Sequence, residues 1–203
     1  MNRHSKAAEA VAATGPRPVV VLGVCGSIAA HKAVDLTSQL TKAGFEVHVV
    51  LTASAQKFVT AIPFRTLSRQ PVLTDLWVEE DWKPGHIKLA DVADLLLVAP
   101  ATANLIAKMA LGLADDALSC VALALNPKAR VMVAPAMNGH MWTHPATRHN
   151  VELLEGRGVE FVGPGTGLLS CGYEGQGRLA PVETILARVQ HLLSRETPRP
   201  PAK

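Results

Sequence analysis

A single cysteine, Cys171, lies in the glycine-rich stretch "GTGLLSCGYEGQGRLA" (Gly165 to Ala180). Glycine has no side chain to bury and leaves the backbone free, so this stretch is a poor place for a structural thiol. A thiol on such a loop can instead reach a bound molecule and exchange a proton with it. A buried, inert cysteine is the alternative, and it suits Cys25 and Cys120, which lie in apolar runs.

Two loops that carry hydroxyl groups indicate an anion site. In "VLGVCGSIAAHK", Gly26 permits a tight turn and Ser27 precedes a helix, whose free N–H groups and dipole attract a phosphate. In "LTASAQKF", Thr52 and Ser54 follow the next strand along the chain. Neither loop has a dinucleotide or triphosphatase motif, so together they favour a mononucleotide phosphate. A simple helix cap is the alternative for Ser27.

Two further loops carry amide side chains. In "APATANLIAKMALG", Thr102 and Asn104 stand where a helix begins, and capping alone explains only one of them. In "APAMNGHMW", the amide of Asn138 can donate to a carboxylate, although a local turn in which its side chain bonds its own backbone is the alternative. Met137 and Met141 suit packing better than chemistry.

The elements that position these loops alternate between strands and helices. Nearly continuous apolar strands separated by amphipathic helices are typical of an α/β domain whose parallel sheet is covered on both faces. In such sheets ligands bind at the carboxyl ends of the strands, so the loops after Val24, Thr52, Pro100 and Ala136 should meet. The predicted strands cover 18–24, 46–52, 71–75, 93–100, 129–136 and 159–163, and the predicted helices 28–44, 55–60, 102–112, 115–126, 144–158 and 181–195.

Bulk composition sets the domain organisation. The 203 residues are 48% hydrophobic and 18% charged, which suits one domain over 18–194, with a disordered lead over 1–17 and a disordered tail over 195–203. The net charge of +3 is small and no basic run carries aromatic residues, so nucleic acid is not expected as a partner. No apolar run is long enough to span a membrane. Three widely spaced cysteines and unclustered histidines predict neither a disulfide framework nor a metal site, and they fit the cytoplasm.

Four motifs in this order carry a family resemblance: "GSIAAHK", "PATANLIAK", "APAMNGHMW" and "GLLSCGYEGQGRL". From about Pro18 to Val189 the chain resembles the flavin-containing cysteine decarboxylases, and most closely the stand-alone bacterial phosphopantothenoylcysteine decarboxylases of coenzyme A biosynthesis. The resemblance implies a Rossmann-like (flavodoxin-like) fold and bound FMN. It also implies a homo-oligomer, a trimer or a dodecamer of trimers, with active sites between subunits.

The resemblance also assigns roles to individual residues. Asn138 matches the residue that binds the substrate carboxylate, His86 in "GHIKLA" the active-site histidine, and Cys171 the proton donor. Taken alone, His86 is better explained as a surface or helix-capping residue, and the family match reverses this preference. Leu105, Ser170 and Leu179 depart from residues common in the family. The residues that match its FMN-binding positions are Gly26, Ser27, Ile28, Thr52, Ser54, Thr102, Ala103, Asn104, Ala136 and Met137.

The chemistry that this family performs requires an electron sink. A cysteine carboxylate attached through an amide has none, but oxidation of its CH2–SH carbon by a flavin gives a thioaldehyde, and loss of CO2 then gives an enethiol. The expected substrate is 4′-phosphopantothenoylcysteine, whose enethiol is reduced again to 4′-phosphopantetheine. The alternatives are an oxidative decarboxylase of a peptide's C-terminal cysteine, which would not need Cys171, a non-catalytic regulator with this fold, and a flavodoxin-like electron carrier.

Overall fold

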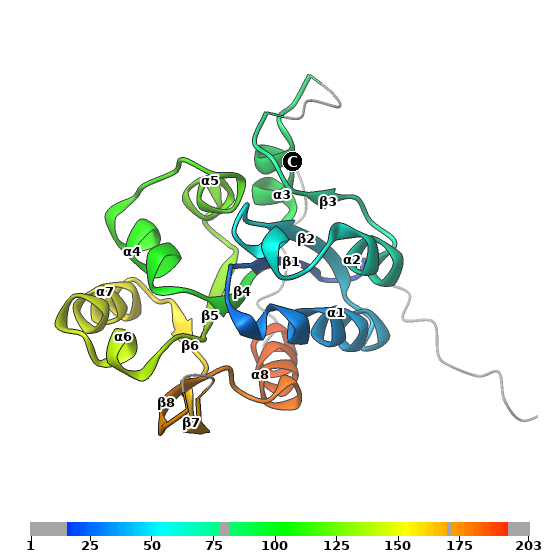
Figure 1. The fold of residues 1–203 in the computed structure, drawn as a ribbon. Coiled ribbons are helices and arrows are strands. Elements are labelled where there is room, and N and C mark those ends of the chain that lie inside the picture. The colour runs from blue at the N-terminus through cyan, green and yellow to red at the C-terminus, as the bar shows by residue number, and fades with distance from the viewer. Residues whose placement is uncertain (1–15, 78–81, 170–171, 195–203) are drawn as a thin grey trace, which may run out of the picture.

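A computed structural model describes residues 16–77, 82–169 and 172–194 of the chain. Its centre is a six-stranded sheet in which every neighbouring pair is parallel (Figure 1). The order β3-β2-β1-β4-β5-β6 places the change of direction between β1 and β4, where ligands bind in folds of this class. The strands are β1 (Val19–Val24), β2 (Glu46–Leu51), β3 (Val72–Leu73), β4 (Leu95–Ala101), β5 (Arg130–Pro135) and β6 (Glu160–Phe161).

The central strands are buried on both faces, which is why they read as continuous apolar runs. All seven residues of β4 are buried. In β1, Val20 and Leu22 belong to one hydrophobic cluster and Val21 to the other, because successive side chains of a strand point to opposite faces. The predicted parallel sheet is therefore confirmed, with strand bounds shifted by one or two residues.

Helices cover both faces of the sheet, as Figure 1 shows. Leu36 and Ile185 pack in the cluster of one face, and Ile106 and Val121 in the cluster of the other. The first face carries α1 (Lys32–Lys42), α2 (Ala61–Ser68) and α8 (Val182–Ser194), and the second α3 (Gly85–Val92), α4 (Ala103–Leu111), α5 (Ala117–Ala124) and α7 (Pro145–Gly156). Three short elements complete the set: η1 (Ile28–His31), η2 (Ala55–Lys57) and α6 (Gly139–Thr143).

Several elements differ from what the sequence patterns predicted. Helices α2 and α3 were not predicted, since each has only eight residues and shows little periodicity. The short helix expected over 55–60 is a single 3-10 turn, η2. The glycine-rich stretch expected as a loop forms an antiparallel hairpin of β7 (Gly165–Leu168) and β8 (Glu174–Arg178). Because this stretch is rich in glycine, it lacks the alternation of apolar and polar side chains that normally reveals a strand.

The ends of the predicted domain remain predictions. The lead and tail expected over 1–17 and 195–203 lie outside the described residues, except for Pro16 and Arg17. Among the residues that are described, no helix is both long and apolar enough to cross a membrane.

Candidate active site

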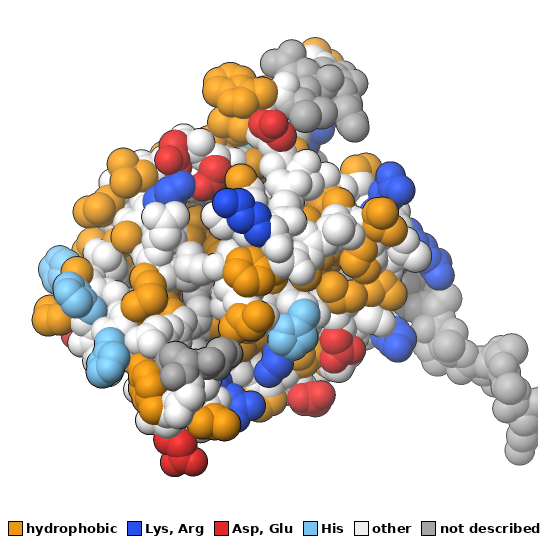
Figure 2. Space-filling model, viewed as in Figure 1, with side chains coloured by type: hydrophobic (Ala, Val, Ile, Leu, Met, Phe, Trp, Pro, Cys, Tyr) orange, Lys and Arg blue, Asp and Glu red, His pale blue; other side chains and the backbone are white. Residues whose placement is uncertain are grey.

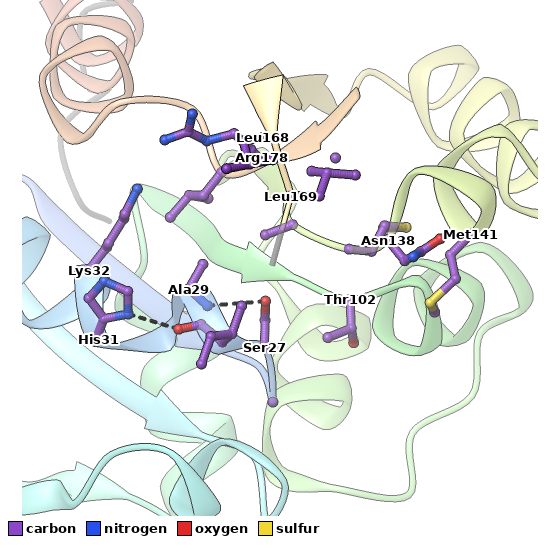
Figure 3. Close-up of a pocket in the computed structure, with 16 residues that line it drawn as sticks. Ser27, Ala29, His31, Lys32, Thr102, Asn138, Met141, Leu168, Leu169 and Arg178 are labelled. Atoms are coloured by element: carbon purple, nitrogen blue, oxygen red, sulfur yellow. Dashed lines mark hydrogen bonds between the residues drawn. The ribbon is translucent and has the colours of Figure 1, made fainter. Parts of the chain in front are cut away.

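A cavity of about 450 Å³ lies where the loops after β1, β4 and β5 meet the β7–β8 hairpin (Figure 3). Its volume is in the range of small-molecule and cofactor sites. Three of the four loops that the sequence predicted to meet at this edge therefore border one space. The lining residues are Gly26, Ser27, Ile28, Ala29, His31, Lys32, Thr102, Ala136, Met137, Asn138, Met141, Leu168, Leu169, Gly177, Arg178 and Leu179.

The fourth loop, after β2, lies directly behind the first. A Cβ atom added to Gly26 would lie 2.4 Å from Cβ of Ser54 and 2.9 Å from its backbone carbon, so only glycine fits here. Ser54 and Thr52 are nevertheless not among the residues that line the cavity. The hydroxyl of Thr52 accepts the N–H of Ala55, the first residue of η2, at 3.1 Å. In this chain the second loop supports the first.

Ser27 begins the turn that leads into α1. Its Oγ accepts the N–H of Ala29 at 3.3 Å, which makes it the N-cap of η1, and it also lines the cavity. Capping and ligand contact are therefore compatible here. The cap leaves a hydroxyl and a helix start facing the cavity, an arrangement that suits a phosphate.

Thr102, at the end of β4, likewise caps a helix and lines the cavity. Its Oγ1 accepts the N–H of Leu105 at 3.5 Å as the N-cap of α4, and it lines the cavity. Ala103 and Asn104 follow it on the helix, where Asn104 is exposed, and neither lines the cavity.

The thiol of Cys25 lies beneath these loops. It is buried, and this burial raises its pKa to about 12, against the opposing effect of hydrogen bonds to Thr102. Cys25 is therefore a packing residue, as predicted. Cys120 is only half-buried, and its Sγ donates to the carbonyl of Ala114 at 3.3 Å.

Asn138 caps α6 and faces the cavity. Its Oδ1 accepts the backbone N–H of His140 at 2.8 Å and the hydroxyl of Tyr173 at 3.0 Å. A backbone N–H can only donate, so the atom it contacts must be the oxygen of the carboxamide. Both lone pairs of this oxygen are thus engaged, and the NH2 group is the donor branch of the side chain. Its side chain lies beside Thr102 and Met141 in Figure 3.

The hairpin is held against the loop that carries Asn138. The N–H of Met137 donates to the carbonyl of Gly177 at 3.0 Å. A Cβ atom on Gly177 would lie 2.2 Å from the carbonyl oxygen of Met137, so the approach depends on glycine. The ring of Tyr173 lies 5.5 Å from that of His140. The hairpin therefore forms one wall of the cavity.

Two residues predicted for catalysis stand apart from this geometry. His86 is half-buried on α3 and does not line the cavity of its own chain. Cys171 lies outside the described residues, although Leu168 and Leu169 before it border the cavity. The roles of both residues stay predictions.

Sequence reasoning missed two basic residues of the site, His31 and Lys32, which border the cavity. Arg178, for which the sequence left open a substrate contact and a solvated surface role, lines the cavity from the hairpin. A signal for the first two exists, because positive side chains at a helix start oppose the helix dipole and so point to an anion nearby. Tyr173 was missed as well, although it is the only tyrosine of the chain.

The lining residues suit a flavin mononucleotide. At the β1 end of the cavity, hydroxyl groups and a helix start suit a phosphate. Ile28, Met137 and Leu169 offer apolar surface for a flat ring. Among the described residues, no group of three histidine, cysteine or acidic side chains is placed to hold a metal ion.

Comparison with known proteins agrees with this geometry. The model of the family described as Flavoprotein matches residues 9–194. A probable phosphopantothenoylcysteine decarboxylase of Streptococcus mutans is 42% identical over 175 residues, which are 86% of this chain and 98% of the relative. The coenzyme A biosynthesis bifunctional protein CoaBC of Bacillus subtilis is 46% identical over 182 residues, 89% of this chain. The match spans only 44% of that longer relative.

Solved structures share the fold and the cofactor. A PPC decarboxylase variant complexed with pantothenoylaminoethenethiol has a TM-score of 0.79 and 31% identity, covering 88% of this chain and 100% of the other. The FMN binding protein AtHal3 has a TM-score of 0.78 and 31% identity, covering 90% and 100%. The chain therefore belongs to the flavoprotein family, and over nearly its whole length it is similar to a PPC decarboxylase and to an FMN binding protein.

Proposed function

We propose that this chain decarboxylates 4′-phosphopantothenoylcysteine to 4′-phosphopantetheine, an FMN-dependent step of coenzyme A biosynthesis in the cytoplasm. The observation that carries the proposal is the carboxamide of Asn138, held with its oxygen engaged at the wall of a flavin-sized cavity. The similarity to a probable phosphopantothenoylcysteine decarboxylase over 98% of its length supports the same reaction.

The chain's own loops would hold the cofactor. The hydroxyls of Ser27 and Thr102 and the start of η1 are placed to bind it. Residues that follow them, such as Ala29 and Leu105, are buried and hold the loops in place. When bound, FMN supplies the oxidation of the substrate's CH2–SH carbon and the later return of that hydride. The protein then has to orient the substrate, exclude water and move protons.

Asn138 orients the carboxylate. Its NH2 group can donate to a carboxylate oxygen, whereas its own oxygen is turned toward His140 and Tyr173. A neutral donor suits this task, because the carboxylate must leave as uncharged CO2. A positive partner would stabilise the charged ground state more strongly. The electron pair of the broken C–C bond moves to the sulfur of the thioaldehyde, which leaves an enethiolate, and protonation of the sulfur gives the enethiol.

Cys171 then supplies a proton. We propose that its thiol is the donor to the carbon that has lost CO2, because residues of β7 and β8, which precede and follow Cys171 in the sequence, border the cavity. An oxidative decarboxylase that stops at the enethiol has no use for this donor. Replacing Cys171 by serine should still release CO2 but accumulate the enethiol in place of 4′-phosphopantetheine, and normal product output would remove this role.

Three basic side chains suit the phosphate of the substrate. His31, Lys32 and Arg178 border both the main cavity and a second one of about 510 Å³ beside it, and Figure 3 shows them together at one end of the site. No carboxylate among the described residues lies within ion-pair distance of them. The Nδ1 atom of His31 lies 2.8 Å from the carbonyl oxygen of Ile28, which orients its ring. A neutral C-terminal peptide has no group that needs such a cluster.

A second copy of the chain would complete the site. His86 does not reach the cavity of its own chain, and large apolar side chains are exposed, a group of them over α2 in Figure 2. Exposed apolar surface of this kind marks an interface. We propose a homo-oligomer, a trimer or a larger assembly of trimers, in which His86 of one copy faces the cavity of another. Light scattering of the purified protein should give a mass of at least three chains.

The experiment that tests the function compares three substrates by mass spectrometry of their products. The FMN-loaded protein should convert 4′-phosphopantothenoylcysteine to 4′-phosphopantetheine, should turn over the unphosphorylated compound more slowly, and should leave a cysteine-ended peptide unchanged. Release of an enethiol from the peptide, with no conversion of the phosphorylated compound, would instead establish the oxidative peptide decarboxylase.

A variant of Asn138 links this activity to the site. Asn138→Asp keeps the acceptor for His140 and Tyr173 but replaces the NH2 group by a second oxygen, which repels the carboxylate. Mispositioning a reacting group costs about 100-fold in rate, and we expect a fall in kcat/KM of about that size. Unchanged turnover would show that Asn138 has another task.

A further inference from the structure

We infer that Tyr173 is a positioning residue that gives the site its preference for a carboxylate, by keeping the Asn138 carboxamide in one orientation. This inference rests on the proposed function and adds a residue to it. The hydroxyl of Tyr173 lies 3.0 Å from Oδ1 of Asn138, although the two residues belong to segments 35 positions apart. Tyr173 itself does not line the cavity, so it acts through Asn138.

The hairpin holds the ring of Tyr173 in a slot made by two glycines. A Cβ atom on Gly139 would lie 3.2 Å from the tyrosine oxygen, and one on Gly175 would lie 3.2 Å from Cε2 of the ring. The carbonyl of Tyr173 accepts the N–H of Leu169 at 2.8 Å, which fixes its backbone. The ring also lies against His140, with centroids 5.5 Å apart. Contacts of the ring and of the backbone therefore direct the hydroxyl at Asn138, and Gly139 leaves room for it.

Two donors on one oxygen have a chemical consequence. A carboxamide oxygen has two lone pairs, and those of Asn138 accept the N–H of His140 and the hydroxyl of Tyr173. A carboxylate can only accept hydrogen bonds, so it must meet the NH2 branch. If the carboxamide turned over, its NH2 group would face the N–H of His140, which can only donate, and the hydroxyl of Tyr173 would have to change from donor to acceptor. The orientation that binds a carboxylate is therefore the one that His140 and Tyr173 favour together.

This arrangement predicts an effect that depends on the carboxylate. The variant Tyr173→Phe removes one of the two donors and leaves the ring, the slot and the His140 contact in place. A single hydrogen bond contributes about 0.5–1.5 kcal/mol, which is about two- to tenfold in binding. Only a ligand with a carboxylate should lose this factor, because only that ligand uses the oriented NH2 group.

The test measures the affinity of the FMN-loaded protein for two ligands by titration calorimetry. One is 4′-phosphopantothenoylserine, which keeps the carboxylate but has no thiol to oxidise, and the other is its ethanolamine counterpart without the carboxylate. We expect the wild-type protein to bind the serine ligand more tightly. In Tyr173→Phe this advantage should fall about two- to tenfold, with the ethanolamine ligand affected far less.

A matched control separates positioning from general loosening of the hairpin. Glu174→Gln removes an exposed charge from the next residue of the hairpin, and it should leave the ratio of the two affinities as in the wild type. Equal weakening of both ligands by Tyr173→Phe, or an unchanged ratio, overturns the role of Tyr173 while the proposed function stands. Failure of the wild-type protein to bind either ligand overturns the proposed function, and this inference with it.

Discussion

The loop after β1 and the β7–β8 hairpin are both rich in small residues and both wall the same cavity, yet they are held in different ways. The loop leaves β1, whose Val20, Leu22 and Val24 are completely buried, and it continues directly into α1. The hairpin has exposed residues along both strands. Within the described residues, hydrogen bonds join it to the rest of the domain at Met137, Asn138 and Pro164. The part that would hold the cofactor is rigid, and the part that would close over the substrate is attached at a few points.

This difference matches the tasks of the two regions. A cofactor that stays bound through many turnovers is best held by elements that the core fixes. A substrate must enter and leave, and regions with few buried contacts open at low free energy. Substitutions in the two regions should therefore separate cofactor binding from turnover.

The largest effect is expected at the hairpin. In Gly177→Ala the new Cβ atom would meet the carbonyl oxygen of Met137 at 2.2 Å, so the hairpin must move away from the Asn138 loop. Displacement by about 1 Å can cost 100-fold in rate. We expect kcat/KM to fall by about that factor while the flavin absorbance of the purified protein stays normal. Loss of the flavin from this variant would contradict the separation of the two regions.

The reverse result is expected at the loop after β1. Gly26→Ala would place a Cβ atom 2.4 Å from Cβ of Ser54 and force the two loops apart. Such overpacking costs about 1–3 kcal/mol, which is about 5- to 150-fold in the affinity for FMN. Fluorescence titration of the apoprotein with FMN measures it. Wild-type affinity in this variant would show that the cofactor does not depend on this loop.

A smaller effect is expected from a second substitution in the same loop. Ser27→Ala removes the cap of η1 and one hydroxyl of the cavity. Loss of an N-cap costs about 1 kcal/mol, so we expect a comparable fall in the free energy of unfolding and a weaker affinity for FMN. Urea unfolding with and without FMN distinguishes the two contributions. The matching change on the hairpin, Thr166→Ala, removes an exposed hydroxyl and should alter neither quantity.

The last effect appears only at alkaline pH and concerns the buried thiol beneath the loop. The pKa of Cys25 is raised from its ordinary value of 9.0 to about 12, so the folded protein keeps a proton that the unfolded chain loses above pH 9. Stability is therefore fully present below pH 9 and declines between pH 9 and 12, by up to about 1.4 kcal/mol per pH unit. Unfolding of the wild type and Cys25→Ala at pH 8, 9 and 10 measures the difference in slope. Equal slopes would show that Cys25 ionises freely in the folded state.

The predicted site residues differ in how far the sequence could place them. Asn138 and Thr102 follow strong strands, so their positions at the sheet edge could be predicted from the sequence and are found there. Thr52 and Ser54 could be placed near that edge but not relative to the cavity, because the packing of one loop against another decides which side chains face it. His86 was assigned through family resemblance, and nothing in its local sequence reveals that α3 lies away from this cavity.

The parallel sheet, the strand ends that border the site and the FMN-binding family could be recognised in the amino-acid sequence, because these depend on local apolar patterns and short motifs. Three features emerged only from the folded chain: the glycine-rich stretch is a hairpin, Tyr173 meets Asn138, and His31, Lys32 and Arg178 share one end of the cavity. Those contacts join segments far apart along the chain. Their geometry is set by how the hairpin docks on the sheet, which no local pattern of residues encodes.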